Sequence, residues 1–272
     1  MKRVETLKEK ARQIRIETLD MILNSGSGHI GGSFSVNDIL VALYYDVMHI
    51  SKDPMDPGRD RFVLSKGHAN PALYAILMDV GYVSKDAKSS LRQFGSPFQG
   101  HPDSAMCSGI DCTTGSLGQG VSVGVGMALG LKKLKGTQRV FIVTGDGELN
   151  EGLCWEAFMA AANFELDNLT VIIDRNMIQL GDNTEKLMRL GDLKGKMESF
   201  GFVVDEIDGH DFKVLLPALE KKTVGKPHCI IARTIKGKGV SYMENSAAWH
   251  GGIPKGDQIT QAYAELGGTY NG

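Results

Sequence analysis

The feature that most constrains the fold is a set of three short, almost wholly apolar segments, at residues 139–144, 169–174 and 228–233. A strand that is apolar on both faces must be buried on both faces, as in parallel sheets that helices cover from two sides. Between and around these strands, helical spacing is found over residues 151–164, 191–200 and 211–223, and residues 202–205 predict a further strand. We therefore expect an α/β fold in which a parallel sheet has helices on both faces.

The amino-terminal half contributes more helices and one more strand. Apolar residues at helical spacing predict a helix over residues 4–24, which a glycine-rich loop follows. Ser35 and Asp38 resemble a capping box, so we expect the next helix to begin there and to run to residue 48. Further elements are expected as a strand at 61–65, a helix ending near 80 and a small-residue helix over 118–135.

The tail is the least regular part of the sequence. Residues 236–272 are glycine-rich and poorly periodic, so we expect the tail to be extended and loop-rich. Because no internal repeat or linker interrupts the chain, we expect residues 1–272 to form a single domain.

Composition excludes several classes of protein. Hydrophobic residues make up 42% and charged residues 23%, values that exclude bulk disorder. The formal net charge of −2 and the lack of an apolar run of about 18 residues argue against nucleic-acid and membrane partners. The four cysteines have no metal-binding spacing, and the charged first residues do not resemble a signal peptide, so we expect a cytoplasmic protein.

One motif predicts a metal site. Gly145, Asp146 and Gly147 directly follow one predicted strand, and Asn176 follows the next strand 30 residues after Asp146. If these strands are neighbours, both polar side chains emerge at the same edge of the sheet, where ligands bind in open α/β folds. A carboxylate, an amide and a backbone carbonyl are oxygen donors that suit Mg²⁺ or Ca²⁺, and a diphosphate would supply further oxygens and charge. The glycines would let the backbone approach such a ligand. The alternative is an ordinary turn with a helix-capping Asp146, but the spacing to Asn176 favours the metal site.

Four histidines lie in loops that contain glycine. They are His29, His68, His101 and His250. An imidazole can donate a hydrogen bond to a phosphate or a sugar hydroxyl and can exchange a proton near neutral pH, so these positions suit a site. The alternative is that they are surface or capping residues, and we apply that ordinary structural interpretation to His49, His210 and His228.

Two further glycine patterns are ambiguous. Gly124, Gly126 and Gly130 resemble a dinucleotide-binding fingerprint with one extra residue, but they follow no predicted strand and lie inside a predicted helix. Close helix packing is therefore the favoured interpretation of these glycines. Residues 234–239 contain two lysines and two glycines and could be either a basic phosphate-binding loop or a solvated turn.

The ordered motifs resemble the transketolase family. The combination of GDG and a downstream Asn is similar to the thiamine diphosphate motif, and other segments narrow the resemblance. These are Ser27-Gly28-His29 with Gly31, residues 64–68 (LSKGH), Gly100-His101-Pro102, residues 114–120 (TGSLGQG) and Glu151-Gly152. Ser116 stands where single-chain members usually carry Pro. Deoxyxylulose-phosphate synthase shares some of these segments, but the context of His101 and Leu117 favours transketolase.

The resemblance implies a thiamine diphosphate-binding fold and a role for each matching position. It implies that Asp146, the Asn176 side chain and the Ile178 carbonyl bind Mg²⁺, with Ca²⁺ or Mn²⁺ as possible substitutes. Cofactor-binding positions would be His68, Gly115, Leu117, Gly145, Asp146, Gly147, Asn176 and His250. Catalytic positions along the substrate channel would be His29, His101 and His250, and Glu151 would lie at a subunit interface.

The resemblance also implies a partner. It covers only the first of the three domains of a full transketolase, the one that binds the cofactor diphosphate. No carboxylate of this sequence matches the glutamate that protonates the cofactor's pyrimidine ring, so a second, C-terminal subunit with the pyrimidine-binding domain is expected to supply it. Together the two subunits, as an α2β2 heterotetramer, would move a two-carbon ketol unit from a ketose phosphate to an aldose phosphate in the pentose phosphate pathway.

Two alternatives remain open at this point. The chain could be a subunit of a related thiamine diphosphate enzyme that acts on a sulfo-sugar or a branched pentulose phosphate. It could also be a non-catalytic cofactor-binding protein, although the four loop histidines argue against the loss of activity.

Overall fold

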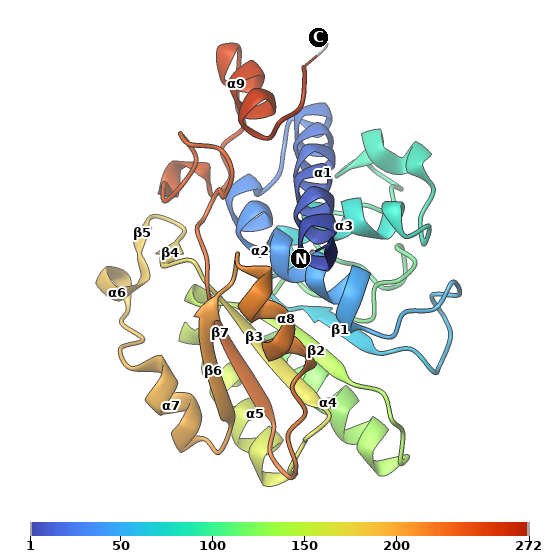
Figure 1. Cartoon of the computed structure of the whole chain (residues 1–272), viewed down its shortest axis with the longest axis vertical. Coiled ribbons are helices and arrows are strands. Elements are labelled where there is room, and N and C mark those ends of the chain that lie inside the picture. Colours follow the sequence, from blue (N-terminus) through green and yellow to red (C-terminus); the bar gives the residue numbers. More distant parts are fainter. Residues whose placement is uncertain (1, 271–272) are drawn as a thin grey trace.

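The structure, a computed structural model, describes residues 2–270 and within them contains a five-stranded parallel sheet (Figure 1). The strand order is β1-β2-β3-β7-β6. The strands are β1 (Arg61–Leu64), β2 (Val140–Gly145), β3 (Leu169–Arg175), β6 (Val203–Asp208) and β7 (His228–Arg233). The parallel sheet expected from the apolar segments is therefore confirmed, with β3 at its centre between β2 and β7.

Helices cover both faces of this sheet, and each face has its own hydrophobic core. One face carries α1 (Lys2–Ser25), α2 (Ile30–Ala42), α3 (Asn70–Asp79) and α8 (Phe212–Glu220). The opposite face carries α4 (Gln119–Lys133), α5 (Gly152–Asn163) and α7 (Leu193–Ser199). Alternate residues of one strand enter opposite cores, since Phe141 and Val143 pack with the first set and Val140 and Ile142 with the second. This two-sided burial explains why the strands are apolar along their whole length.

The predicted start of the second helix is wrong. Helix α2 begins at Ile30 rather than near Ser35, and all of its residues are buried. The polar residues that resemble a cap are bonded to distant parts of the chain. Ser35 donates to Asp174 on β3, and Asp38 accepts from Arg15 on α1 and pairs with His210. Burial opposes ionisation of Asp38, but the Arg15 charge and the His210 bond outweigh it and lower the Asp38 pKa to about 2.

Several elements lie outside the predicted set. A hairpin joins β4 (Ile178–Gln179) to β5 (Asp182–Asn183), and α6 (Thr184–Leu187) follows it. The tail is not loop throughout, because it contains α9 (Asp257–Glu265), whose end meets α1 where Arg12 donates to the carbonyls of Leu266 and Gly267. Within residues 2–270 the longest helices are too short or too polar to cross a bilayer.

The close packing predicted for the glycines of α4 holds at one of the three positions. A Cβ on Gly124 would lie 2.5 Å from Ile142 Cδ1 on β2, whereas Gly126 and Gly130 have no atom within 4 Å of that position. Of these three glycines, Gly124 alone brings α4 close to the sheet, and a small residue has no packing role at the other two.

Candidate functional site

The carboxyl ends of β2 and β3 adjoin, because Gly145 is the register partner of Asp174. Asp146 and Asn176 directly follow these strands, so the two residues lie at the same edge of the sheet, as the sequence analysis required for a shared site. The Asp146 carboxylate accepts hydrogen bonds from the backbone N–H groups of Gly147 and Met177, both at 2.8 Å. Asn176 Oδ1 accepts from the Ile178 N–H at 3.1 Å, which holds the Ile178 segment beside the amide.

A pocket of about 300 Å³ lies over this edge of the sheet. Most of the sequence-predicted metal and cofactor positions line it: His68, Leu117, Gly145, Asp146, Gly147, Asn176, Ile178 and His250. Asp146 is only 2% exposed, and burial raises its pKa while the nearby Arg175 charge opposes that rise. A carboxylate buried in this way is stabilised by a cation that binds it.

Two lysines that the sequence analysis did not assign to the site face the same pocket. Lys66 follows β1 and forms an ion pair with the buried Asp174, and its Nζ also donates to the Gly32 carbonyl at 3.1 Å. Lys236 Nζ donates to the Ile178 carbonyl at 3.1 Å and contacts His250 Nδ1 at 2.8 Å. Both side chains are 2% exposed. The segment 234–239 is therefore not a solvated turn, because its Lys236 side chain is buried and points into the pocket. This is the orientation that a phosphate-binding loop requires.

Three imidazole rings meet at one end of the pocket. The ring centroids of His29, His68 and His250 lie 5.1 to 5.2 Å apart in each pair. Burial, assisted by the charges of Arg92 at His29 and of Lys236 at His250, lowers the pKa of His29 and of His250 to about 4 each. The pKa of His68 is also lowered, first by burial and then by the charge of Lys66. All three rings are therefore neutral at neutral pH, each with one N–H donor and one acceptor nitrogen.

The segment that carries Trp249 and His250 lies close to Gly31, in the first turn of α2. A Cβ on Gly31 would lie 2.7 Å from the Trp249 carbonyl oxygen, and the Gly31 carbonyl accepts from the Gly237 N–H. Glycine at position 31 therefore lets the tail lie against α2, which brings His250 from the far end of the sequence to His29.

A second buried carboxylate organises the loops around the pocket. Glu148 is 2% exposed and accepts four hydrogen bonds. They come from Ser65 Oγ at 2.5 Å, Thr144 Oγ1 at 2.7 Å, Gly118 N at 2.8 Å and Gly145 N at 3.0 Å. Glu148 thereby ties the ends of β1 and β2 to the start of α4, where Gly118 has a φ of 82° that favours glycine.

The remaining predicted residues lie beside the pocket rather than in its wall. His101 is exposed, and its ring lies against Gly115, where an added Cβ would be 3.2 Å from His101 Cγ. Glu151 is exposed at the start of α5, so its place at a subunit interface stays a prediction. The structure also adds Gln179, Glu148 and the two lysines, which sequence reasoning missed. The available signals were a glutamate directly after the GDG motif and a lysine two residues before a pocket histidine.

The donor set fits a divalent cation bound together with a diphosphate. Asp146, Asn176 and the Ile178 carbonyl offer oxygens of three kinds, which suit Mg²⁺. Within residues 2–270 no three His, Cys, Asp or Glu side chains gather as a metal cage, so further ligands must come from a bound molecule or water. The buried Lys66 and Lys236 line the same pocket, and their ammonium groups suit an anion that carries more than one negative charge.

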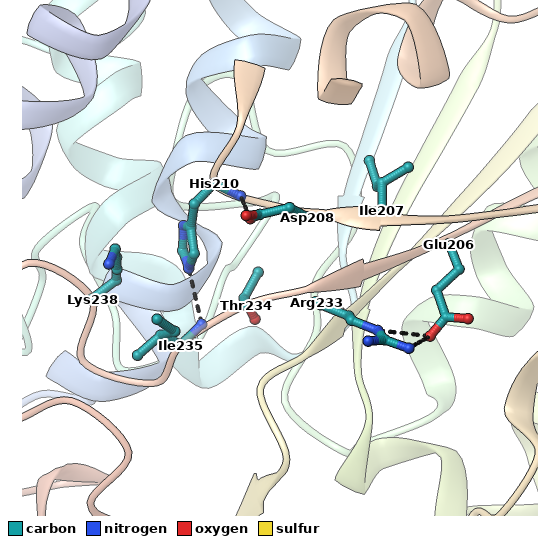
Figure 2. A pocket seen from close by; sticks show the side chains of 8 residues that line it. All are labelled: Glu206, Ile207, Asp208, His210, Arg233, Thr234, Ile235 and Lys238. Carbon is teal, nitrogen blue, oxygen red and sulfur yellow. Dashed lines mark hydrogen bonds and ion pairs between the residues drawn. The ribbon is translucent and has the colours of Figure 1, made fainter. Parts of the chain in front are cut away.

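A larger hollow of about 680 Å³ lies at the ends of β6 and β7 (Figure 2). Most of its charged side chains are paired within the chain. Arg233 pairs with Glu206, Lys238 pairs with Glu244, and His210 lies between Asp38 and the Ile235 N–H. His210 therefore has the ordinary structural role that the sequence suggested, and the smaller pocket remains the candidate site.

Comparison with known proteins adds sequence and structural relatives. Residues 6–271 match the family described as transketolase, thiamine diphosphate binding domain. One subunit of the apulose-4-phosphate transketolase of Phocaeicola vulgatus is 41% identical over 266 residues, which cover 97% of this chain and 94% of that protein. The SqwG subunit of the 6-deoxy-6-sulfo-D-fructose transketolase of a Clostridium species is 42% identical over 265 residues, 96% of each chain. The structure of transketolase from Leishmania mexicana matches with a TM-score of 0.92 and 31% identity, covering 97% of this chain and 41% of that one. The chain thus spans nearly all of the two subunits and less than half of the solved enzyme.

Proposed function

Because this chain belongs to the transketolase family of thiamine diphosphate-binding domains, we propose that it binds the diphosphate end of thiamine diphosphate as one subunit of a two-subunit ketol-transferring enzyme. The observation that carries the proposal is one pocket lined by three residues that offer oxygen ligands, two buried lysines and two imidazoles. Such a pocket suits a Mg²⁺–diphosphate group better than it suits an uncharged ligand.

The residues that line the pocket have different tasks in this proposal. Asp146, Asn176 and the Ile178 carbonyl would hold Mg²⁺, and Lys66 and Lys236 would balance the charge of the diphosphate. The bound cofactor would supply the carbanion chemistry that breaks and forms a carbon–carbon bond beside a carbonyl. The protein residues position this group and keep the surrounding imidazoles neutral.

The neutral histidines would handle the sugar. His29 and His250 lie with their rings 5.1 Å apart, and His101 lies beside Gly115 at the exposed side. A neutral imidazole can donate a hydrogen bond to a sugar oxygen, which would help to hold the sugar while a ketol adduct forms and is released. His68 would contact the diphosphate end, together with the Gly147 backbone.

A second subunit is part of the proposal. The carboxylates that line the pocket are Asp146 and Glu148, and both are held by hydrogen bonds within the chain. This supports a glutamate supplied from outside to act on the pyrimidine ring. The near full-length match to proteins named as subunits also supports a C-terminal partner. We propose an α2β2 assembly in the cytoplasm, with Glu151 at its interface.

Two sugar classes are candidates for the substrate. One is the ketose and aldose phosphates of the pentose phosphate pathway. The other is an unusual sugar, and the names of two relatives, which refer to apulose 4-phosphate and to 6-deoxy-6-sulfo-D-fructose, favour it. A non-catalytic binding protein is disfavoured, because two of the loop histidines line the pocket with the three proposed metal ligands and the His29 ring lies beside them.

The test of the proposed function is reconstitution. Ketol transfer is measured for the chain alone and after mixing with a separately produced candidate C-terminal subunit, with a panel of pentulose, branched pentulose and sulfo-sugar donors. We expect an inactive chain and an active mixture. Full activity of the chain alone would overturn the two-subunit proposal, and the preferred donor would decide between the sugar classes.

The metal assignment has its own test. Asp146→Ala removes the only carboxylate of the proposed donor set, so Mg²⁺-dependent binding of thiamine diphosphate should be lost. Asp257→Ala, in the first turn of α9, is the matched control and should bind normally. Unchanged Mg²⁺ dependence in Asp146→Ala would refute the assignment.

A further inference from the structure

The loop between α3 and α4 carries an arginine in an uncommon backbone conformation. Arg92 has a φ of 61°, a left-handed value that is unfavourable for a residue with a side chain. The loop is nevertheless closed by a hydrogen bond of 2.7 Å from the Arg92 N–H to the Phe98 carbonyl. Such strain persists only where surrounding contacts impose it, which makes Arg92 a residue of interest.

The contacts that impose this conformation come from a buried aromatic pair. Phe98 is fully buried and stacks on Tyr74 of α3, with ring centroids 4.6 Å apart. The Tyr74 hydroxyl lies 3.1 Å from the carbonyl oxygens of both Gln99 and His101. The same anchor therefore sets the position of Arg92 at one end of the loop and of His101 at the other.

The Arg92 side chain points from this loop to the segment that carries Ser27 and His29. Its Nη1 donates to Ser27 Oγ at 2.7 Å, and its Nη2 lies 3.0 Å from His29 Nδ1. A guanidinium group has only donors and keeps its proton at any pH that a protein tolerates. The His29 Nδ1 must therefore accept this hydrogen bond, and the single proton of the neutral ring must lie on Nε2.

We propose that Arg92 is a positioning residue that fixes His29 as the Nε2–H tautomer and orients its ring. The inference rests on the proposed function for one point only, namely that the Nε2–H of His29 serves as a donor to a sugar oxygen. The tautomer itself follows from the contact between the two side chains.

The surroundings of His29 favour the same neutral state. The ionisable groups that face it are Arg92, His68, His101, Lys236 and His250, all of them basic. Burial and these charges lower the pKa of His29 to about 4, so a second proton on the ring is disfavoured. With Nδ1 occupied by Arg92, the ring has one donor and that donor points away from the arginine.

The direct test reads the tautomer of His29 in the full chain by ¹H–¹⁵N NMR of the histidine rings at neutral pH. His29 is assigned from the spectrum of His29→Gln. Wild type should give an unprotonated Nδ1 and a protonated Nε2. A protonated Nδ1 on His29 would overturn the proposal. This measurement uses the wild-type residue at position 92, so it does not depend on whether an Arg92 variant folds.

Variants of Arg92 separate tautomer control from a merely structural role. Arg92→Gln offers an amide that can accept as well as donate, so His29 should become a mixture of tautomers. Arg92→Lys offers only donors and should restore the single tautomer. Arg189→Gln, at an exposed position, is the matched control and should leave the His29 signals unchanged. If Arg92→Gln keeps the wild-type spectrum, Arg92 does not fix the tautomer.

A kinetic arm uses the chain reconstituted with its C-terminal partner. Loss of a correctly placed proton donor should lower kcat by about tenfold or more in Arg92→Gln, with a smaller change in KM, and Arg92→Lys should recover most of it. Equal loss in the Lys and Gln variants, despite different tautomers, would contradict the positioning role. If the wild-type complex is inactive while the tautomer is as expected, the proposed function fails and the tautomer assignment stands.

Discussion

Glu148 offers the sharpest test of how the pocket is held together. Its two carboxylate oxygens each accept one hydroxyl and one backbone N–H: Oε1 from Ser65 and Gly118, and Oε2 from Thr144 and Gly145. In Glu148→Gln one oxygen becomes an NH₂ group that cannot accept. A hydroxyl can rotate to accept from the new NH₂, but the backbone N–H beside it cannot.

The magnitude follows from this geometry. Either orientation of the glutamine amide leaves one buried backbone N–H facing a donor, which costs about 1–3 kcal/mol. The other bonds lose the charge of the carboxylate, and each bond to a charged group contributes about 1.5–3 kcal/mol against about 1 for a neutral one. We expect Glu148→Gln to lower the free energy of unfolding by about 3 kcal/mol, a large fraction of the roughly 5–15 typical of a protein.

The assay is urea unfolding of the full chain followed by circular dichroism. The matched control is Glu156→Gln on the exposed side of α5, which should change the midpoint little. A Glu148→Gln midpoint equal to that of wild type would refute the reasoning, because it would mean that position 148 works equally well with a neutral side chain.

Three further predictions test other parts of the molecule. The Asp38 pKa of about 2 lies below its ordinary value near 4, so the ionised side chain adds stability above pH 4 that is lost as the pH falls toward 2. The free energy of unfolding, measured with urea, should fall by about 2 kcal/mol over this range in wild type and change little in Asp38→Asn. Gly124→Ala should destabilise by about 1–3 kcal/mol, because its Cβ would meet the sheet at 2.5 Å, whereas Gly126→Ala, with open space around it, should stabilise by about 0.5–1 kcal/mol; equal midpoints for the two variants would contradict the packing argument. Lys236→Met should weaken thiamine diphosphate binding measured by calorimetry about 10- to 100-fold, whereas Lys238→Met, half-exposed and paired with Glu244, should change it less than about threefold; similar losses in both would indicate a general effect of charge.

Local patterns in the sequence predicted the parallel sheet correctly, together with the position of Asp146 and Asn176 at the ends of two strands that prove to be neighbours. The apolar runs of β2, β3 and β7 predict strands because a strand buried on both faces has no polar face to show. The spacing of Asp146 and Asn176 predicts a shared edge because each residue directly follows a strand, and the strands are register partners. These inferences needed only short-range pattern and the usual geometry of parallel sheets.

The polar residues between these elements were less predictable. Ser35 and Asp38 resemble a helix cap in sequence, yet their partners are on β3, on α1 and beside β6. Lys66 precedes a predicted pocket histidine, but nothing nearby in the sequence indicates that it pairs with Asp174, 108 residues away. A buried polar group must find a partner, and its identity depends on which segments the fold brings together.

The sequence by itself determined the class of fold and the fact that Asp146 and Asn176 each directly follow an apolar strand, because each of these depends on residues close together in the chain. Only the tertiary structure decided which charged side chains share the pocket and which ring nitrogen of His29 carries the proton. Those properties depend on burial and on contacts such as Arg92 with His29, 63 residues apart, and such contacts exist only once the chain has folded.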